Sequence, residues 1–112
     1  TVSVTPTNAN STLRIRCTLN MAVTLAGPCQ MALFVDSTAN CLATAAQYAS
    51  TANQIVSVTL EYIVTAGSTS SRTYRLRAGP GAASTMTING VSSAGKYNST
   101  MISGIVVEEI LP

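Results

Sequence analysis

The stretch at residues 12–25 reads TLRIRCTLNMAVTL and alternates without a break. Every odd position in it is apolar: Leu13, Ile15, Cys17, Leu19, Met21, Val23 and Leu25. Every even position is polar or small: Thr12, Arg14, Arg16, Thr18, Asn20, Ala22 and Thr24. A period of two predicts a strand with one buried and one solvated face, and it argues against a helix, around which these side chains would scatter.

Further alternating stretches predict the remaining strands of an all-β fold. We expect them at residues 2–6, 29–35, 41–50, 54–65, 72–78, 84–89 and 101–111. Alanine favours a helix at 41–50, but that stretch is short and has no caps, so we predict a strand. The turn signal Gly27-Pro28 predicts a hairpin between the first long strand and 29–35. About eight antiparallel strands and no helix predict a jelly-roll sandwich, in a single domain over residues 1–112.

The composition restricts the classes of partner. Charged residues make up only 9% of the chain and the net charge is +2, whereas a nucleic-acid interface needs clustered Lys and Arg on several phosphates. Ser and Thr account for 29 of the 112 residues, so the surface is suited to hydrogen bonds with sugars or water. A chain that is 46% hydrophobic and poorly charged is also expected to bury surface in an oligomer.

The sequence carries no signal of membrane insertion, and its first residue suggests that the chain is part of a longer protein. No apolar run reaches the length of about 18 residues that a membrane-spanning helix needs. The chain begins at Thr1 without Met, and we therefore expect it to be part of a longer protein.

Enzymatic and metal chemistry find no support in the sequence. There is no His to serve as general base for a nucleophilic Ser. Glu108 and Glu109 are adjacent on an expected strand, so they point to opposite faces and cannot act as a catalytic pair. The three cysteines, spaced by twelve without CxxC, argue against zinc. We expect no enzyme, metal or cofactor. Cys17 and Cys29 are predicted as buried thiols, with one disulfide and a free thiol as the alternative.

Two groups of residues are candidates for ligand binding. Arg75 and Arg77 are expected on one face of a strand, where guanidinium groups suit the carboxylates of acidic sugars or of a neighbouring subunit. Lys96, Tyr97 and Asn98 combine a cation, an aromatic ring and an amide on one predicted loop. The alternative for both groups is an ordinary solvated surface, and Glu108 and Glu109 are possible partners across a subunit interface.

Several stretches resemble one family of viral domains. They read RTYRLRAGP at 72–80, STMTING at 84–90 and SGIVVEEI at 103–110, and MALFVD at 31–36 is similar to an ALFRD strand, with Val35 in place of the usual Arg. Together they resemble the trimeric jelly-roll knobs at the tips of bacteriophage tail fibres, tail spikes, tail needles and head fibres. The broad fold of those knobs is similar to the heads of tumour necrosis factor and C1q.

The resemblance implies a homotrimer with the terminal strand near the threefold axis, formed by the C-terminal part of a longer fibre or spike protein. It further implies a non-enzymatic fibre or spike tip on the virion, which binds a glycan or a protein of the host cell surface. The alternative is a purely structural trimerisation or capsid-decoration domain with no receptor of its own. A monomeric carbohydrate-binding module is a third hypothesis, which the few aromatic residues disfavour. No binding motif of the family matches here residue by residue, so no site is transferred.

Overall fold

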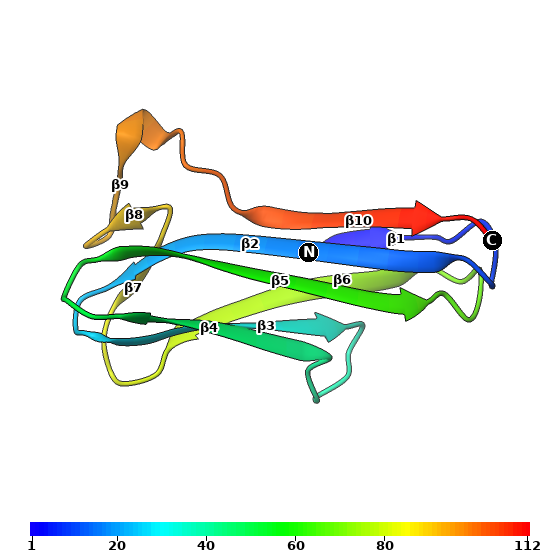
Figure 1. Ribbon diagram of the computed structural model, residues 1–112, viewed down its shortest axis with the longest axis horizontal. Helices are drawn as coiled ribbons and strands as arrows, with labels where there is room; N and C mark the ends of the chain where they lie inside the picture. The colour runs from blue at the N-terminus through cyan, green and yellow to red at the C-terminus, as the bar shows by residue number, and fades with distance from the viewer.

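Ten strands and one short 3-10 turn form the structure, a computed structural model of residues 1–112 (Figure 1). The strands are β1 (Val2–Val4), β2 (Thr12–Val23), β3 (Gly27–Val35), β4 (Ala43–Ala49), β5 (Ile55–Thr65), β6 (Arg72–Pro80), β7 (Met86–Ile88), β8 (Gly90–Val91), β9 (Ala94–Gly95) and β10 (Gly104–Ile110). The 3-10 turn, η1 (Tyr97–Ser99), follows β9. The all-β class is therefore confirmed, and the Ala-rich stretch is a strand, β4.

Eight of the strands form two antiparallel sheets that face each other, and β8 and β9 pair as a separate two-stranded sheet. One sheet has the order β1-β6-β3-β4. The other has the order β10-β2-β5, and β7 pairs with β2 beyond the point where β10 ends. The chain crosses from one sheet to the other between β1 and β2 and between β2 and β3. It crosses again between β4 and β5, between β5 and β6, and between β6 and β7, and this repeated crossing is the winding of a jelly roll.

The predicted hairpin between the first two long strands is wrong. β3 pairs with β4 and β6, whereas β2 pairs with β5, β7 and β10, so the turn at residues 24–26 connects the two sheets. Gly27 and Pro28, which the sequence assigned to the turn, are the first two residues of β3. The physical reason is that β2 and β3 each carry a continuous apolar face. Packing these faces against each other across the sandwich buries both of them, which placement side by side in one sheet would not do.

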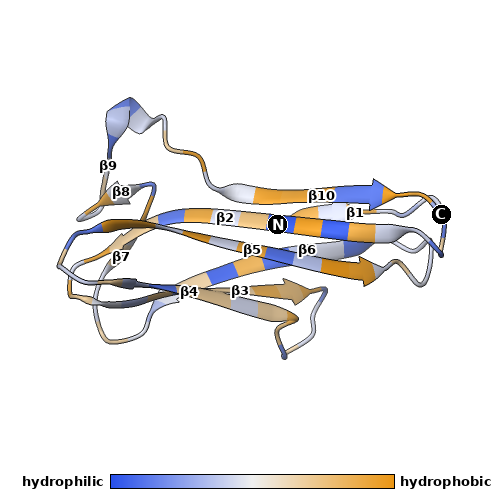
Figure 2. Ribbon diagram, in the orientation of Figure 1, coloured by the Kyte–Doolittle hydropathy of each residue, from blue (hydrophilic) through white to orange (hydrophobic).

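The core lies between the sheets and follows the alternation. Leu13, Ile15, Cys17, Met21 and Val23 of β2 are buried, and the same phase of β3 supplies Cys29, Met31, Leu33 and Val35. Figure 2 shows the alternation as orange and blue bands along β2. The alternation continues in the sequence to Leu25, but β2 ends at Val23 and Leu25 is 58% exposed in the turn.

The three cysteines are free, and two of them belong to the core. Cys17 and Cys29 are buried, as the sequence predicts, and Cys41 is exposed on the loop after β3. Burial raises the pKa of both core thiols, because the low-dielectric interior disfavours the thiolate. The two core cysteines therefore act as small apolar side chains.

Candidate functional site

Arg75 and Arg77 lie on the outer face of β6, and both are close to one aromatic ring. Phe34 of β3 is directly opposite Arg75 in the strand register, and Ala32 is opposite Arg77. The guanidinium carbons of Arg75 and Arg77 are 5.4 Å and 5.5 Å from the centroid of the Phe34 ring. Both distances are within the range of a cation–π interaction, so the ring orders two cations on one surface.

Two depressions adjoin this group because both are lined by Phe34 and Arg77. The first has a volume of about 440 Å³ and extends over β3 and β4. Its other lining residues include Gln30, Ala32, Thr44, Ala46 and Gly79. The second, of about 550 Å³, is bounded by Arg75 and the loop at residues 36–39. We call the two depressions together the Arg–Phe hollow. Small side chains on its strands leave the space that Phe34 and Arg77 do not fill.

The two arginines of the hollow have no carboxylate partner. The ion pairs of the chain involve Arg14, Arg16 and Arg72 instead. Arg75 Nη2 donates to the Thr38 carbonyl oxygen at 3.3 Å, and Arg77 makes no hydrogen bond within the chain. Both arginines were predicted from the sequence, whereas Phe34 was missed. Its signal was present, because Met31, Leu33 and Val35 occupy the buried phase and leave Phe34 on the outer face.

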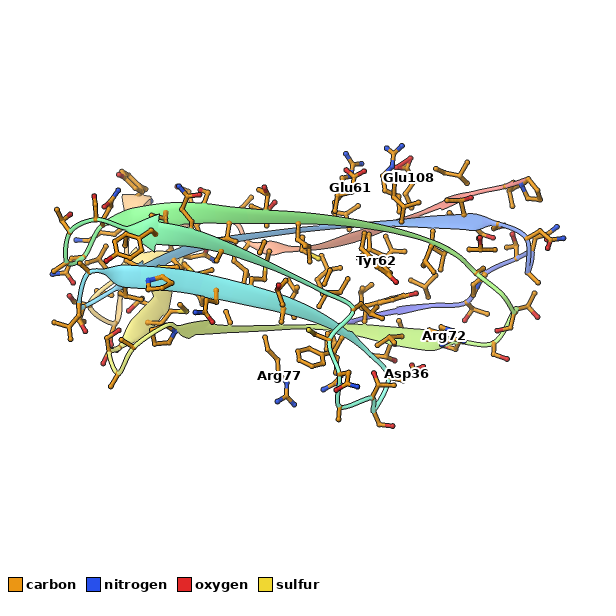
Figure 3. The ribbon with its side chains drawn as sticks, turned by 60° about the horizontal axis from the view of Figure 1, so that its bottom comes forward. Asp36, Glu61, Tyr62, Arg72, Arg77 and Glu108 are labelled. Carbon is orange, nitrogen blue, oxygen red and sulfur yellow. The ribbon has the colours of Figure 1, made fainter.

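Asp36 is the one acidic group at the hollow, and it is already engaged. Its carboxylate lies 3.6 Å from Arg72 Nη1 and accepts a hydrogen bond from the Thr73 amide at 2.9 Å. Figure 3 shows Asp36 beside Arg72, and Arg77 projecting from the same side of the sandwich. The hollow is therefore lined by two arginines and one carboxylate, and that carboxylate is paired with Arg72, so the hollow has a net positive charge.

Lys96, Tyr97 and Asn98 lie on a separate surface. They belong to the loop and 3-10 turn after β9, at one end of the molecule and beside the sheet that contains β10 (Figure 1). The Tyr97 side chain is 72% exposed. Tyr97 and Asn98 both have positive φ, of 53° and 56°, a region that non-glycine residues seldom adopt. No hydrogen bond or ion pair joins this loop to Arg75 or Arg77. The five residues predicted to bind a ligand therefore lie in two separate surface regions.

The outer face of β10-β2-β5 carries a row of ion pairs. Arg14 of β2 lies 3.9 Å from Glu61 of β5 and 3.8 Å from Glu108 of β10, and Arg16 lies 3.5 Å from Glu108. Glu61 and Glu108 are on the opposite side of the sandwich from Arg77 (Figure 3). We call this surface the ion-pair face.

The ion-pair face also exposes large apolar side chains. Ile63 of β5 is 57% exposed and Val106 of β10 is 58% exposed, and Ile110 follows Val106 along the same face. In register, Ile63 is opposite Arg14 and Val106 is opposite Arg16. Apolar and charged side chains therefore alternate across three adjacent strands.

Glu109 points away from the ion-pair face, as predicted from its adjacency to Glu108. Its Oε1 accepts hydrogen bonds from the Thr7 amide and the Thr7 hydroxyl, both at 2.9 Å, and from the Asn8 amide at 3.4 Å. The Ser11 hydroxyl, followed by the Thr7 and Asn8 donors, lowers the pKa of Glu109 below its ordinary value. Glu109 thus attaches the loop between β1 and β2 to the last strand, and both Glu108 and Glu109 are engaged within the chain.

Replacing Glu109 by glutamine is expected to lower the melting temperature modestly at pH 7. A carboxylate whose pKa is lowered by folding stabilises the native state above its unfolded pKa, and this contribution is lost as the pH falls through the native pKa. The difference between wild type and E109Q should therefore shrink on acidification below the ordinary value of 4.5. Circular dichroism melts at pH 7 and at acidic pH measure this difference. An equal difference at both pH values would show that the charge of Glu109 contributes nothing.

Neither a metal site nor a membrane-spanning helix is found. The structure brings together no group of three or more His, Cys, Asp or Glu side chains that could hold a metal ion. None of its helical segments has the length and apolar character needed to cross a membrane. Comparison with protein-family models finds no match, and neither does comparison with curated proteins.

Proposed function

We propose that this domain is the non-enzymatic tip of a bacteriophage fibre or spike, which assembles as a homotrimer on the virion and binds the host cell surface. The observation that carries the proposal is the ion-pair face, with its exposed Ile63 and Val106 between Arg14, Arg16 and Glu108. The resemblance of the last strands to trimeric phage knobs supports two further copies of the same chain as its partner.

The ion-pair face has the composition of a surface that associates with itself. Each apolar side chain placed in an interface contributes about 25 cal/mol for every Å² of apolar area removed from water. The charges on the face are of both signs, so copies of it can be electrostatically complementary. Single exposed ion pairs contribute little to stability, so burial of the exposed Ile63 and Val106 should supply most of the free energy of association.

A trimer would also explain how a weak site can serve attachment. In this arrangement each copy presents its own Arg–Phe hollow, on the sheet opposite the ion-pair face. Three sites on one rigid particle that engage a repetitive cell surface together bind far more tightly than one site does. Recognition then requires only modest affinity from each hollow.

The absolute mass in dilute buffer tests the proposal first. Light scattering is expected to give three times the 11.5 kDa of one chain. A monomer at micromolar concentration would contradict the trimer and favour a monomeric sugar-binding module. Binding of the labelled trimer to a panel of bacterial strains then separates the two trimeric hypotheses. Attachment to some strains supports a receptor-binding tip, and a trimer that attaches to none supports a purely structural or decoration domain.

A further inference from the structure

The Arg–Phe hollow combines two arginines that have no carboxylate partner with an apolar ring and a groove lined mostly by small and apolar side chains. We propose that it binds a carboxylate-bearing sugar residue, with the carboxylate held by Arg75 and Arg77. This inference rests on the proposed function, because it names the chemistry of the cell-surface receptor. The charge of the hollow, the geometry of its donors and the shape of the groove each support it.

The charge of the hollow selects an anion. Arg75 and Arg77 line it, and Asp36, the single carboxylate at the hollow, is occupied by Arg72 and the Thr73 amide. Figure 3 shows Glu61 and Glu108 on the other side of the molecule, so they do not neutralise this surface. An incoming carboxylate would therefore be attracted with no like charge free to repel it.

The donors are arranged for a carboxylate. Arg75 and Arg77 are two residues apart on one strand, which separates their origins by about 6.6 Å and directs both to the same face. The Phe34 ring contacts both guanidinium groups, and the Thr38 carbonyl holds one end of Arg75. This ordering reduces the conformational entropy that binding would otherwise remove. Arg77 has all of its donors free, and a planar guanidinium can bind both oxygens of a carboxylate.

The groove beside Arg77 has the size and lining for a sugar ring. Its volume of about 440 Å³ is within the usual range of ligand pockets. Ala32, Ala46 and Gly79 allow a ring to approach the sheet, and Gln30 and Thr44 supply an amide and a hydroxyl for sugar hydroxyl groups. Phe34 offers an apolar surface to the C–H groups of the ring. This mixture favours a saccharide over inorganic phosphate, which would use the charges alone.

Calorimetric titration with defined oligosaccharides tests the assignment. The probes are oligogalacturonate, hyaluronan oligosaccharide and oligosialic acid, with neutral maltohexaose and dextran sulfate as comparisons. We expect at least one carboxylated probe to bind more tightly than both comparisons, and to bind more weakly as salt is added. The R75Q/R77Q variant should lose this affinity by about tenfold or more, since each charge-assisted pair is lost.

Two further variants separate recognition from net charge. R75K/R77K keeps both charges but removes the planar guanidinium groups, so its affinity should fall between those of wild type and R75Q/R77Q. T69E/S70E lowers the net charge by the same amount as R75Q/R77Q, in the exposed turn between β5 and β6, and should bind like wild type. Equal loss in T69E/S70E and R75Q/R77Q would overturn the site. So would the absence of any preference for carboxylated probes.

A failure of the proposed carboxylate-sugar site can be distinguished from a failure of the proposed function. Mass and attachment to bacterial cells are measured on the same preparations. If R75Q/R77Q remains trimeric and attaches to cells like wild type, the hollow is not the receptor site and the proposed function stands. If the wild-type chain is monomeric and still binds a carboxylated probe through these arginines, the hollow is supported and the trimeric fibre tip is contradicted.

Discussion

The double variant V106Q/I63Q is expected to sediment and scatter light as a single chain of 11.5 kDa, at concentrations where the wild-type domain is a trimer. Val106 and Ile63 are the most exposed large apolar side chains on the strands of the ion-pair face, and the proposed trimer buries them. Burying an amide without a hydrogen-bond partner costs about 1–3 kcal/mol. The cost applies to both residues in all three copies, so the trimer should dissociate.

The fold of a single V106Q/I63Q chain should be unaffected, because both positions face solvent in the monomer. A far-ultraviolet circular dichroism spectrum identical to that of wild type checks this. The matched control is L25Q, because Leu25 is 58% exposed as well but lies in the turn between β2 and β3. L25Q should remain trimeric. A trimeric V106Q/I63Q would place the subunit interface on another surface.

Replacing Leu13 by alanine is expected to destabilise the protein by about 2–5 kcal/mol, whereas L25A should change its stability by no more than about 0.5 kcal/mol. The two leucines occupy the same phase of one alternating stretch. Leu13 is 1% exposed between the sheets, and its removal leaves a cavity. Leu25 lies beyond the end of β2 and loses little contact with the core.

Urea denaturation of both variants and of wild type measures the difference. All three proteins are compared at one concentration, because association adds to apparent stability. A typical domain has a stability of about 5–15 kcal/mol, so the loss in L13A is a large part of the total. Similar losses in L13A and L25A would contradict the structure, since they would mean that the buried strand extends through Leu25.

The candidate site was predictable only in part. Arg75 and Arg77 were identified because residues two apart on a strand share a face, which is a local property. Their partner Phe34 is far away in the sequence, and only the pairing of β3 with β6 brings it beside them. The loop residues Lys96, Tyr97 and Asn98 had a suggestive composition, but composition does not place a loop beside a sheet that is distant in the chain.

The amino-acid sequence by itself determined the eight main strands and most of the side chains that enter the core, because strand pleating makes alternate residues face opposite sides. It did not predict the short strands β8 and β9. Only the tertiary structure decided which strands pair. That choice separated β2 from β3, ended β2 before Leu25, and placed the arginines of β2 and β6 on opposite faces of the sandwich. The reason is that strand pairing depends on the free energy gained when apolar faces of distant segments are buried against each other. A local sequence pattern does not contain this free energy.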